Sequence, residues 1–403
     1  MPAIEVKPGI HWIGVNDRTT DLFEGMWPIT QEGVSYNSYL VIDEKKALVD
    51  LANTSHAGTL LDQITDVIDP STLDYVVINH MEPDHTGAIN LLCQVAPNVT
   101  FLCSAKAAPM LEAFYGVSPD HVQVMEEGQE VSLGAKTLQF LMIPFVHWPE
   151  TMATYEREQR VAMTGDAFGG FGALRGAIFD ENYPDMTFYR AEALRYFSNI
   201  VAKYSTPVLR AIDKLSKMPV DVIAPSHGLL WRQNPQEIVD MYGTWSGYAA
   251  TGGLPGVTLI YGSMYGNTEE MMNAVAAGIS SAGVPLGIFD AARTHASYIL
   301  AHLWQYRGVM IGAPTYEAGV FPPVAQALGL ITEKRVMRKM VARFGSYGWS
   351  GGGQRAVETI LEPLKWQWSE NLEFRGAPTR ENLHQGEEFG KRFAESLLEG
   401  AGA

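Results

Sequence analysis

Residues 80–87 (HMEPDHTG) place two histidines and two carboxylates within six positions, directly after an apolar run that is typical of a buried strand. Imidazole nitrogens and carboxylate oxygens are ligands for divalent metal ions. Because side chains alternate along a strand, we expect His80 and Glu82 to face one site. A proline then turns the chain, so that Asp84 and His85 can face a second site.

Three more candidate ligands each follow another predicted strand. His147 comes after the run LQFLMIPF, Asp166 comes after VAMTG, and His227 comes after DVIAP together with a serine. A lone histidine at such a place is usually structural, whereas seven ligands in this order are specific. The sequence therefore predicts a dinuclear metal site at one rim of the strands, held by His80, Glu82, Asp84, His85, His147, Asp166 and His227.

The chemistry of these ligands favours iron. The chain has two cysteines, Cys93 and Cys103, which lie in apolar runs and are expected to be core thiols. The ligands must therefore supply nitrogen and oxygen. Three of them are carboxylates, and hard oxygen ligands favour Fe(II) and Fe(III) relative to an imidazole-rich dizinc arrangement. Three carboxylates and a bridging hydroxide would also offset the charge of two ferrous ions.

The composition of the chain limits what it can bind. It has 403 residues, 46% of them apolar, which is enough for two or three domains with their own cores. Its formal charge of −16 argues against nucleic acid or an anionic membrane as a partner. We find no charged-then-apolar leader and no apolar stretch of spanning length, so we expect a cytoplasmic protein.

The first part of the chain, residues 1–250, mixes short β-like runs with helical patterns near residues 57–68, 86–96, 105–114 and 188–216. Strands whose ends share one rim predict an αββα sandwich. Residues 242–256 (YGTWSGYAATGGLPG) are rich in glycine and small residues, and we interpret them as a linker. A second domain is predicted at 255–403.

From residue 256, apolar strands alternate regularly with loops and helix-like segments; the strands read VTLIYG, PLGIF, GVMIGAP and MVARFGS. This alternation is typical of right-handed βαβ units in an open parallel sheet that is covered on both faces. We therefore predict an α/β fold with a flavodoxin-like, doubly wound parallel sheet. In such sheets the ligand lies beyond the carboxyl ends of the strands.

The first of these strands runs into a loop of hydroxyl, amide and glycine residues that opens a helix. Its backbone N–H groups and the helix dipole make an anion site. The loop lacks the lysine of a nucleoside-triphosphate loop and the spacing of a dinucleotide fingerprint, so a mononucleotide monoester fits better. The predicted phosphate-binding residues are Ser263, Met264, Tyr265, Gly266, Asn267 and Thr268.

Two further loops after strands each carry an aromatic residue. An isoalloxazine ring needs flat apolar faces with backbone donors nearby, and these loops supply both. We therefore predict FMN as a cofactor. Its other expected contacts are Pro314, Thr315, Tyr316, Glu317, Ala318 and Gly319 in the first loop, and Ser346, Tyr347, Gly348, Trp349, Ser350 and Gly351 in the second.

These motifs resemble known families. Residues from 256 to about 400 look like a flavodoxin domain, with SMYGNT at the phosphate loop. The ligand order resembles the metallo-β-lactamase fold, whose hydrolases usually carry His-x-His-x-Asp-His where this chain has Glu82 as the third residue. His-x-Glu-x-Asp-His, then His, Asp and His, then a fused flavodoxin domain, is similar to the flavodiiron proteins (A-type flavoproteins).

The resemblance implies reduction of O2 to water, or of NO to N2O, with electrons passing from a reduced donor through FMN to a diiron centre. It also implies a ligand assignment. One iron would be held by His80, Glu82 and His147, and the other by Asp84, His85 and His227, with Asp166 as the bridge. In some family members the histidine that matches His85 points away from the metals.

Three residues near the ligands are candidates for lining the substrate pocket. Many family members read Phe-His-Gly near the N-terminus, where this chain has Glu24 in place of the histidine. That departure leaves the preference for O2 or NO open, and Glu24 could equally be a surface residue. Trp148 and Phe168 adjoin ligands and could wall the pocket or pack in the core.

The resemblance also implies partners. FMN and the diiron site fall in separate domains, and the family brings them together in a head-to-tail homodimer, in some cases a dimer of dimers. We expect the same arrangement here. No cysteine pair follows the flavodoxin domain, so we expect the direct electron donor to be a separate rubredoxin or another reduced donor.

Two other functions remain open on the sequence alone. The first is a dizinc hydrolase of the metallo-β-lactamase superfamily with a fused flavodoxin domain, although a hydrolase would more often keep histidine at position 82. The second is a non-enzymatic electron carrier or redox sensor, in which the sandwich is a docking surface. A complete set of seven ligands argues against that second function.

Overall fold

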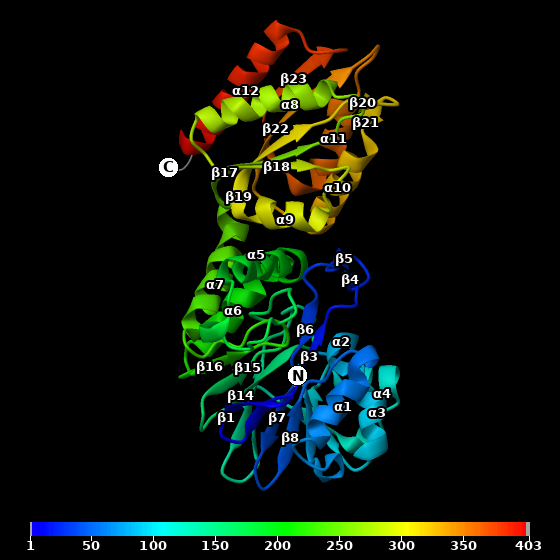
Figure 1. Ribbon diagram of the computed structural model, residues 1–403, viewed down its shortest axis with the longest axis vertical. Coiled ribbons are helices and arrows are strands. Elements are labelled where there is room, and N and C mark those ends of the chain that lie inside the picture. Colours follow the sequence, from blue (N-terminus) through cyan, green and yellow to red (C-terminus); the bar gives the residue numbers. More distant parts are fainter. Residues whose placement is uncertain (1, 400–403) are drawn as a thin grey trace. The chain divides into compact units, whose positions relative to one another are not determined.

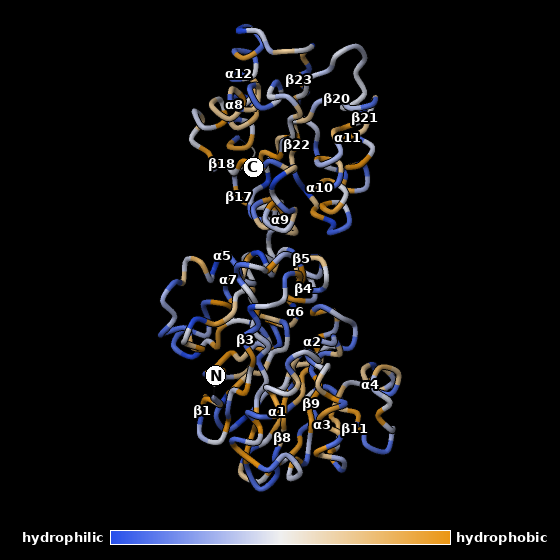
Figure 2. Tube along the Cα trace, turned by 45° about the vertical axis from the view of Figure 1, so that its right-hand side comes forward, coloured by the Kyte–Doolittle hydropathy of each residue, from blue (hydrophilic) through white to orange (hydrophobic). Residues whose placement is uncertain are grey.

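The computed structural model describes residues 2–399 and divides into two compact units, with the division between Ser246 and Gly247 (Figure 1). Both units contain hydrophobic and hydrophilic stretches of chain (Figure 2). Within residues 2–399, no helix is both long enough and apolar enough to cross a membrane. Each unit is described by itself.

The first unit contains two main sheets. The strands of the first, in spatial order, are β1 (Ile4–Lys7), β2 (Ile10–Trp12), β7 (Tyr39–Ile42), β8 (Lys46–Val49), β9 (Tyr75–Ile78), β10 (Thr100–Ser104) and β11 (Val122–Met125). Those of the second are β12 (Glu130–Ser132), β13 (Thr137–Met142), β14 (Met152–Glu156), β15 (Val161–Met163) and β16 (Val222–Ala224). Two short pairs join β3 (Val15–Asp17) to β6 (Val34–Tyr36) and β4 (Leu22–Phe23) to β5 (Trp27–Pro28).

The central strands β8, β9, β14 and β15 and the edge strand β16 are buried on both faces. Every residue of β14, β15 and β16 is buried, and β8 and β9 each leave only their first residue partly exposed. A strand that is apolar on both faces needs a covering layer on each side. The helices of this unit are α1 (Ala57–Thr65), α2 (Pro83–Thr86), α3 (Ile89–Val95), α4 (Ala108–Tyr115), α5 (Met186–Tyr196), α6 (Ser205–Leu215) and most of α7 (Pro235–Thr251).

The expected linker at 242–256 is wrong for most of its length, because α7 runs through it as far as Thr251. The aromatic rings of Tyr242 and Trp245 pack on Phe197, with ring centroids 5.0 and 5.5 Å away. The free energy gained by burying these rings outweighs the helix penalty of about 1 kcal/mol for each glycine within α7. The helix ends at Thr251, and the next two residues, Gly252 and Gly253, have φ angles of +82° and +104°.

The second unit is a parallel five-stranded sheet. Its strands, in spatial order, are β18 (Leu286–Asp290), β17 (Leu254–Tyr261), β19 (Tyr306–Gly312), β22 (Met340–Tyr347) and β23 (Gln367–Arg375). This order, 2-1-3-4-5, is that of the flavodoxin-like doubly wound fold. A small hairpin, β20 (Thr315–Tyr316) with β21 (Gly319–Val320), follows β19.

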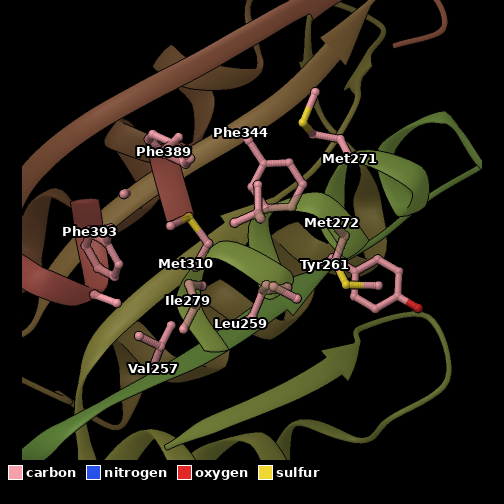
Figure 3. Close-up of a cluster of buried hydrophobic side chains, with 14 of the residues drawn as sticks. Val257, Leu259, Tyr261, Met271, Met272, Ile279, Met310, Phe344, Phe389 and Phe393 are labelled. Atoms are coloured by element: carbon pink, nitrogen blue, oxygen red, sulfur yellow. The ribbon is translucent and has the colours of Figure 1, made fainter. Parts of the chain in front are cut away.

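Helices cover both faces of this sheet. They are α8 (Asn267–Ser281), α9 (Ala296–Gln305), α10 (Pro322–Glu333), α11 (Gly353–Leu361) and α12 (Arg380–Glu399). Helices α8 and α12 lie side by side on one face (Figure 1), where Phe389 and Phe393 join a core with Val257, Leu259 and Met310 (Figure 3). Glycines at the contact between α8 and α12 let the two backbones approach closely.

Candidate metal centre

Each candidate ligand lies just beyond the end of a strand or in the turn that follows it. His80 comes two residues after β9, and α2 begins at a proline, so that Asp84 and His85 lie on its single turn. Asp166 and His227 follow β15 and β16, which are parallel neighbours. Because parallel strands end at the same edge of a sheet, these two side chains reach one site.

The structure brings all seven candidates together in two groups. Within each group, one nitrogen or oxygen from every residue lies within 4.8 Å of the others. The first group is His80, Glu82, His147 and Asp166, and the second is Asp84, His85 and His227. All of these residues are buried except Glu82, which is partly exposed.

The carboxylate of Asp166 connects the two groups. Its Oδ1 lies 2.9 Å from His85 Nε2 and 3.3 Å from His227 Nε2. Its Oδ2 lies 3.2 Å from His147 Nε2 and 3.4 Å from His80 Nε2. One oxygen therefore faces each group, which is the arrangement of a carboxylate that bridges two metal ions.

Unsatisfied buried atoms show that the site fits metal ions. Both carboxylate oxygens of Asp84 and Nε2 of His227 are buried without a hydrogen-bond partner, although His227 Nε2 lies 3.2 Å from Asp84 Oδ2. Buried polar groups are costly when they are left unpaired. A cation between these atoms would satisfy them, so the donor set suits a bound metal better than an empty core.

Contacts behind the ligands fix which ring nitrogen faces the site. His227 Nδ1 donates to the backbone oxygen of Ser35 at 2.7 Å, so its Nε2 keeps a free lone pair. His80 Nδ1 lies 2.8 Å from Glu150 Oε1, which also accepts from the N–H of Met81 at 3.0 Å. Such outer contacts orient metal-binding imidazoles and raise their basicity.

The carboxylates and imidazoles stabilise each other's charged forms. Burial acts to lower the pKa of His227, but the carboxylates of Asp166 and Asp84 beside its Nε2 raise it to about 10. Burial opposes protonation of His147 in the same way, yet Asp166 and Glu82 raise its pKa to about 9. Burial would raise the pKa of Asp166, but the surrounding histidines hold it well below its usual range. A metal ion must displace protons from these imidazoles, so metal binding releases protons.

A cavity of about 270 Å³ opens beside the candidate ligands Glu82 and Asp84. Glu24 lines it, and Glu24 Oε2 accepts a hydrogen bond from the indole N–H of Trp27 at 2.8 Å. The cavity is also lined by Thr20, Leu22, Phe23, Gly25, Tyr36, Asn53 and Pro83. The cavity has room for a diatomic molecule.

The other two predicted pocket residues lie in different surroundings. The ring of Trp148 packs edge-on against the candidate ligand His80, with centroids 5.0 Å apart. Phe168 is buried against Tyr242 of α7, with centroids 5.2 Å apart, and is not among the residues that line the cavity.

Sequence reasoning missed the groups that support and line the site. The carboxylate of Glu150 and the carbonyl of Ser35 position two histidines, while Tyr36 and Asn53 line the cavity. An acidic residue three positions after His147 was the one local signal for Glu150. The other contacts join residues far apart in the chain, so no spacing rule points to them.

The predicted FMN residues gather at the carboxyl ends of β17, β19 and β22, three adjacent strands. Ser263 Oγ accepts from the N–H groups of Gly266 and Glu269 at 3.1 and 3.4 Å, and Thr268 Oγ1 lies 3.2 Å from Ser346 Oγ. Of the aromatic residues in these loops, Tyr265 and Trp349 are 91% and 86% exposed, which leaves flat faces open to a ligand. Pro314–Gly319 includes the hairpin β20–β21 where a plain loop was expected, and Ser346 and Tyr347 belong to β22.

Comparisons with known proteins cover both units. A family model described as ODP family beta lactamase matches residues 34–228, and the flavodoxin model matches residues 259–390. A nitric oxide reductase of Moorella thermoacetica is 30% identical, over 98% of this chain and 99% of that protein. An anaerobic nitric oxide reductase flavorubredoxin of Escherichia coli is 33% identical, over 97% of this chain and 82% of that protein.

A solved structure agrees with these matches. The rubredoxin oxygen:oxidoreductase of Desulfovibrio gigas has a TM-score of 0.94 at 28% identity, with 100% of both chains covered. The comparisons confirm the expected fold class and favour an oxidoreductase over a dizinc hydrolase or a non-enzymatic carrier. The chain belongs to the flavodiiron protein family and is an oxidoreductase.

Proposed function

We propose that this protein reduces O2 to water, NO to N2O, or both, with electrons passing from a reduced donor through FMN to a diiron site. The observation that carries the proposal is the carboxylate of Asp166, which presents one oxygen to each of two buried ligand groups. Relatives along the whole chain are described as a nitric oxide reductase and a rubredoxin oxygen:oxidoreductase.

The ligand assignment is part of the proposal. His80, Glu82 and His147 hold one iron, His227, Asp84 and His85 hold the other, and Asp166 bridges them. His85 is included because its Nε2 faces Asp166 at 2.9 Å. When bound, the irons supply electrons and Lewis acidity, and FMN supplies electrons to them.

The protein's own groups orient the ligands and admit the substrate. Glu150 and the carbonyl of Ser35 hold the rings of His80 and His227 with Nε2 turned inward. The cavity beside Glu82 and Asp84 gives a diatomic substrate a way to the site. Its wall combines the apolar side chains Leu22 and Phe23 with the carboxylate of Glu24.

FMN would bind across the ends of β17, β19 and β22. The backbone N–H groups at the start of α8, with the hydroxyl of Ser263, would hold its phosphate. Glu269 and Glu270 in the first turn of α8 work against the phosphate charge, so the N–H groups and the hydroxyls of Ser263 and Thr268 must outweigh them. The exposed aromatic ring of Trp349 supplies a flat face for the isoalloxazine.

The partners belong to the same proposal. Because electrons must pass between FMN and iron, we expect a head-to-tail homodimer in which each flavin donates electrons to the metals of the other chain. We expect this dimer to be cytoplasmic. The direct donor is a reduced rubredoxin or another reduced electron carrier. This rests on the family and on the naming of the Desulfovibrio gigas relative.

The test measures the rate at which the iron- and FMN-loaded protein consumes O2 or NO. Reduced rubredoxin is the donor, and the gas is added to a chamber that was first made anaerobic and that contains a gas electrode. We expect the wild type to consume at least one of the two gases, and we expect Asp166→Asn to consume neither. The exposed His384→Asn is the matched control and should keep the activity of the wild type. Fully loaded protein that consumes neither gas but hydrolyses thioesters would contradict the proposal.

A further inference from the structure

A buried cation lies beneath the two segments that are expected to hold the flavin ring. Arg343 is on β22 and its side chain is fully buried. Burial of a guanidinium is costly unless the group is paired and hydrogen-bonded, so the hydrogen-bond partners of Arg343 indicate its role. It bonds across the sheet to β23, where its Nη1 donates to Glu373 Oε1 at 2.9 Å and to Asn371 Oδ1 at 3.3 Å.

The other end of the guanidinium reaches the first ring segment, Pro314–Gly319. Arg343 Nη2 donates to the backbone oxygen of Ala313 at 3.1 Å, directly before that segment begins. Thr315 Oγ1 in turn accepts from the N–H of Gly353 at 3.3 Å. Through Arg343, the end of β19 is therefore tied to β22 and β23.

The second ring segment, Ser346–Gly351, is flanked by two glycines that leave room for the guanidinium. A Cβ atom on Gly345 would lie 2.6 Å from Arg343 Nη2, and one on Gly353 would lie 2.5 Å from it. A side chain at either position would push the guanidinium out of its place. The charge thus lies against the bases of both segments.

The charge of Arg343 is only partly cancelled there. Glu373 is 28% exposed, and Glu358, which also interacts with Arg343, is on the surface. Water screens an exposed carboxylate more strongly than a fully buried guanidinium. Arg343 therefore contributes a positive potential at the bases of the two segments, which the carboxylates of Glu373 and, within the first segment, Glu317 oppose.

We propose that Arg343 is a positioning residue for the flavin, which ties the two ring-binding segments together and whose charge favours the reduced, more negative ring over the oxidised one. The inference rests on the FMN binding proposed above. Charges near a flavin ring tune its electronics, and no predicted contact residue of either segment carries a positive charge.

The test is spectroelectrochemical titration of the FMN-loaded protein. Arg343→Met should lower the ratio of reduced to oxidised FMN affinity by about tenfold, which for a two-electron couple is about 30 mV towards lower potential. Glu373→Gln leaves the guanidinium and removes its counter-charge, so it should move the potential in the opposite direction. Arg343→Lys should keep the potential close to that of the wild type.

The control is Arg392→Met, which removes the exposed pair between Arg392 and Glu370 on the same unit, and should leave the potential unchanged. A purely structural role predicts that Arg343→Met and Glu373→Gln weaken both redox forms of FMN equally, with no opposite shifts, and that result would overturn the inference. If Arg343→Met does not fold, the direction in which Glu373→Gln shifts the FMN reduction potential tests the inference by itself. Wild-type protein that binds no FMN would instead overturn the proposed function.

Discussion

At the scale of single residues, Glu82 distinguishes this site from an imidazole-rich one. Its Oε2 lies 3.0 Å from His147 Nε2 and 3.2 Å from His80 Nε2, so it completes the first ligand group. Burial would raise the pKa of Glu82, but its hydrogen bonds to these two histidines hold it well below the usual range. The group is therefore a charged oxygen donor at neutral pH.

Replacing this carboxylate should change which metal the protein retains. Glu82→His adds a third imidazole to the first group and removes a hard oxygen ligand, so we expect iron content to fall and zinc content to rise several-fold. Metal analysis of protein from cells with equal iron and zinc supply measures this. The exposed Glu126→His is the control, and equal metal content in wild type and Glu82→His would refute the role given to Glu82.

Backbone conformation beside a ligand provides a second residue-scale prediction. Gly228 follows His227, has φ of +79°, and a Cβ there would collide with the hydroxyl of Tyr189. That hydroxyl accepts from the N–H of Leu229 at 3.0 Å.

Gly228→Ala should therefore lower the free energy of unfolding by about 2–4 kcal/mol, because it adds backbone strain to a steric clash. Urea denaturation measures the change. Gly58→Ala is the matched control, because Gly58 is on α1 with open space around its Cβ, and it should be neutral or stabilising by about 0.5–1 kcal/mol. Comparable effects of the two substitutions would show that the conformation at Gly228 is not constrained.

At the scale of secondary-structure elements, α9 carries a buried histidine that responds to pH. His302 is 2.8 Å from Thr258 Oγ1 on β17, and its ring contacts Phe289 and Tyr306. Burial, helped by the charge of Lys339, lowers the pKa of His302 to about 4. The unfolded chain therefore binds more protons than the folded chain between about pH 4 and 6.5.

Stability should fall as the pH drops through that window, by on the order of 2–3 kcal/mol for this one group. Thermal or urea unfolding of the wild type and His302→Gln at pH 7 and pH 4.5 tests this. The variant should lose less stability on acidification than the wild type does. The control His384→Gln changes an exposed histidine and should lose as much stability on acidification as the wild type. An equal loss of unfolding free energy in His302→Gln and the wild type would show that His302 does not cause the pH dependence.

The elements also show why some features could be predicted from the sequence and others could not. The convergence of the seven candidate ligands was predictable because they follow apolar strands whose ends share one rim. Helix α7 was not predictable from composition. Its stability comes from the packing of Tyr242 and Trp245 on Phe197, a residue far away in the sequence. Glu150 and Ser35 were missed for the same reason.

At the scale of the whole molecule, each unit contains the candidate residues of one proposed centre, so the proposed electron path requires the two centres to come together. We expect the protein to sediment as a dimer, with about twice the chain mass of 44.3 kDa, under conditions in which it is active. Sedimentation velocity of the loaded enzyme measures this. An active monomer would contradict the head-to-tail arrangement and would require transfer within one chain.

We propose that the seven candidate ligands hold two irons and that the second unit holds FMN. The metal and flavin content of protein purified without oxygen from iron-replete cells tests this most directly. About two irons and one FMN per chain are expected. Two zinc ions per chain, unchanged when iron is abundant, would contradict the diiron site.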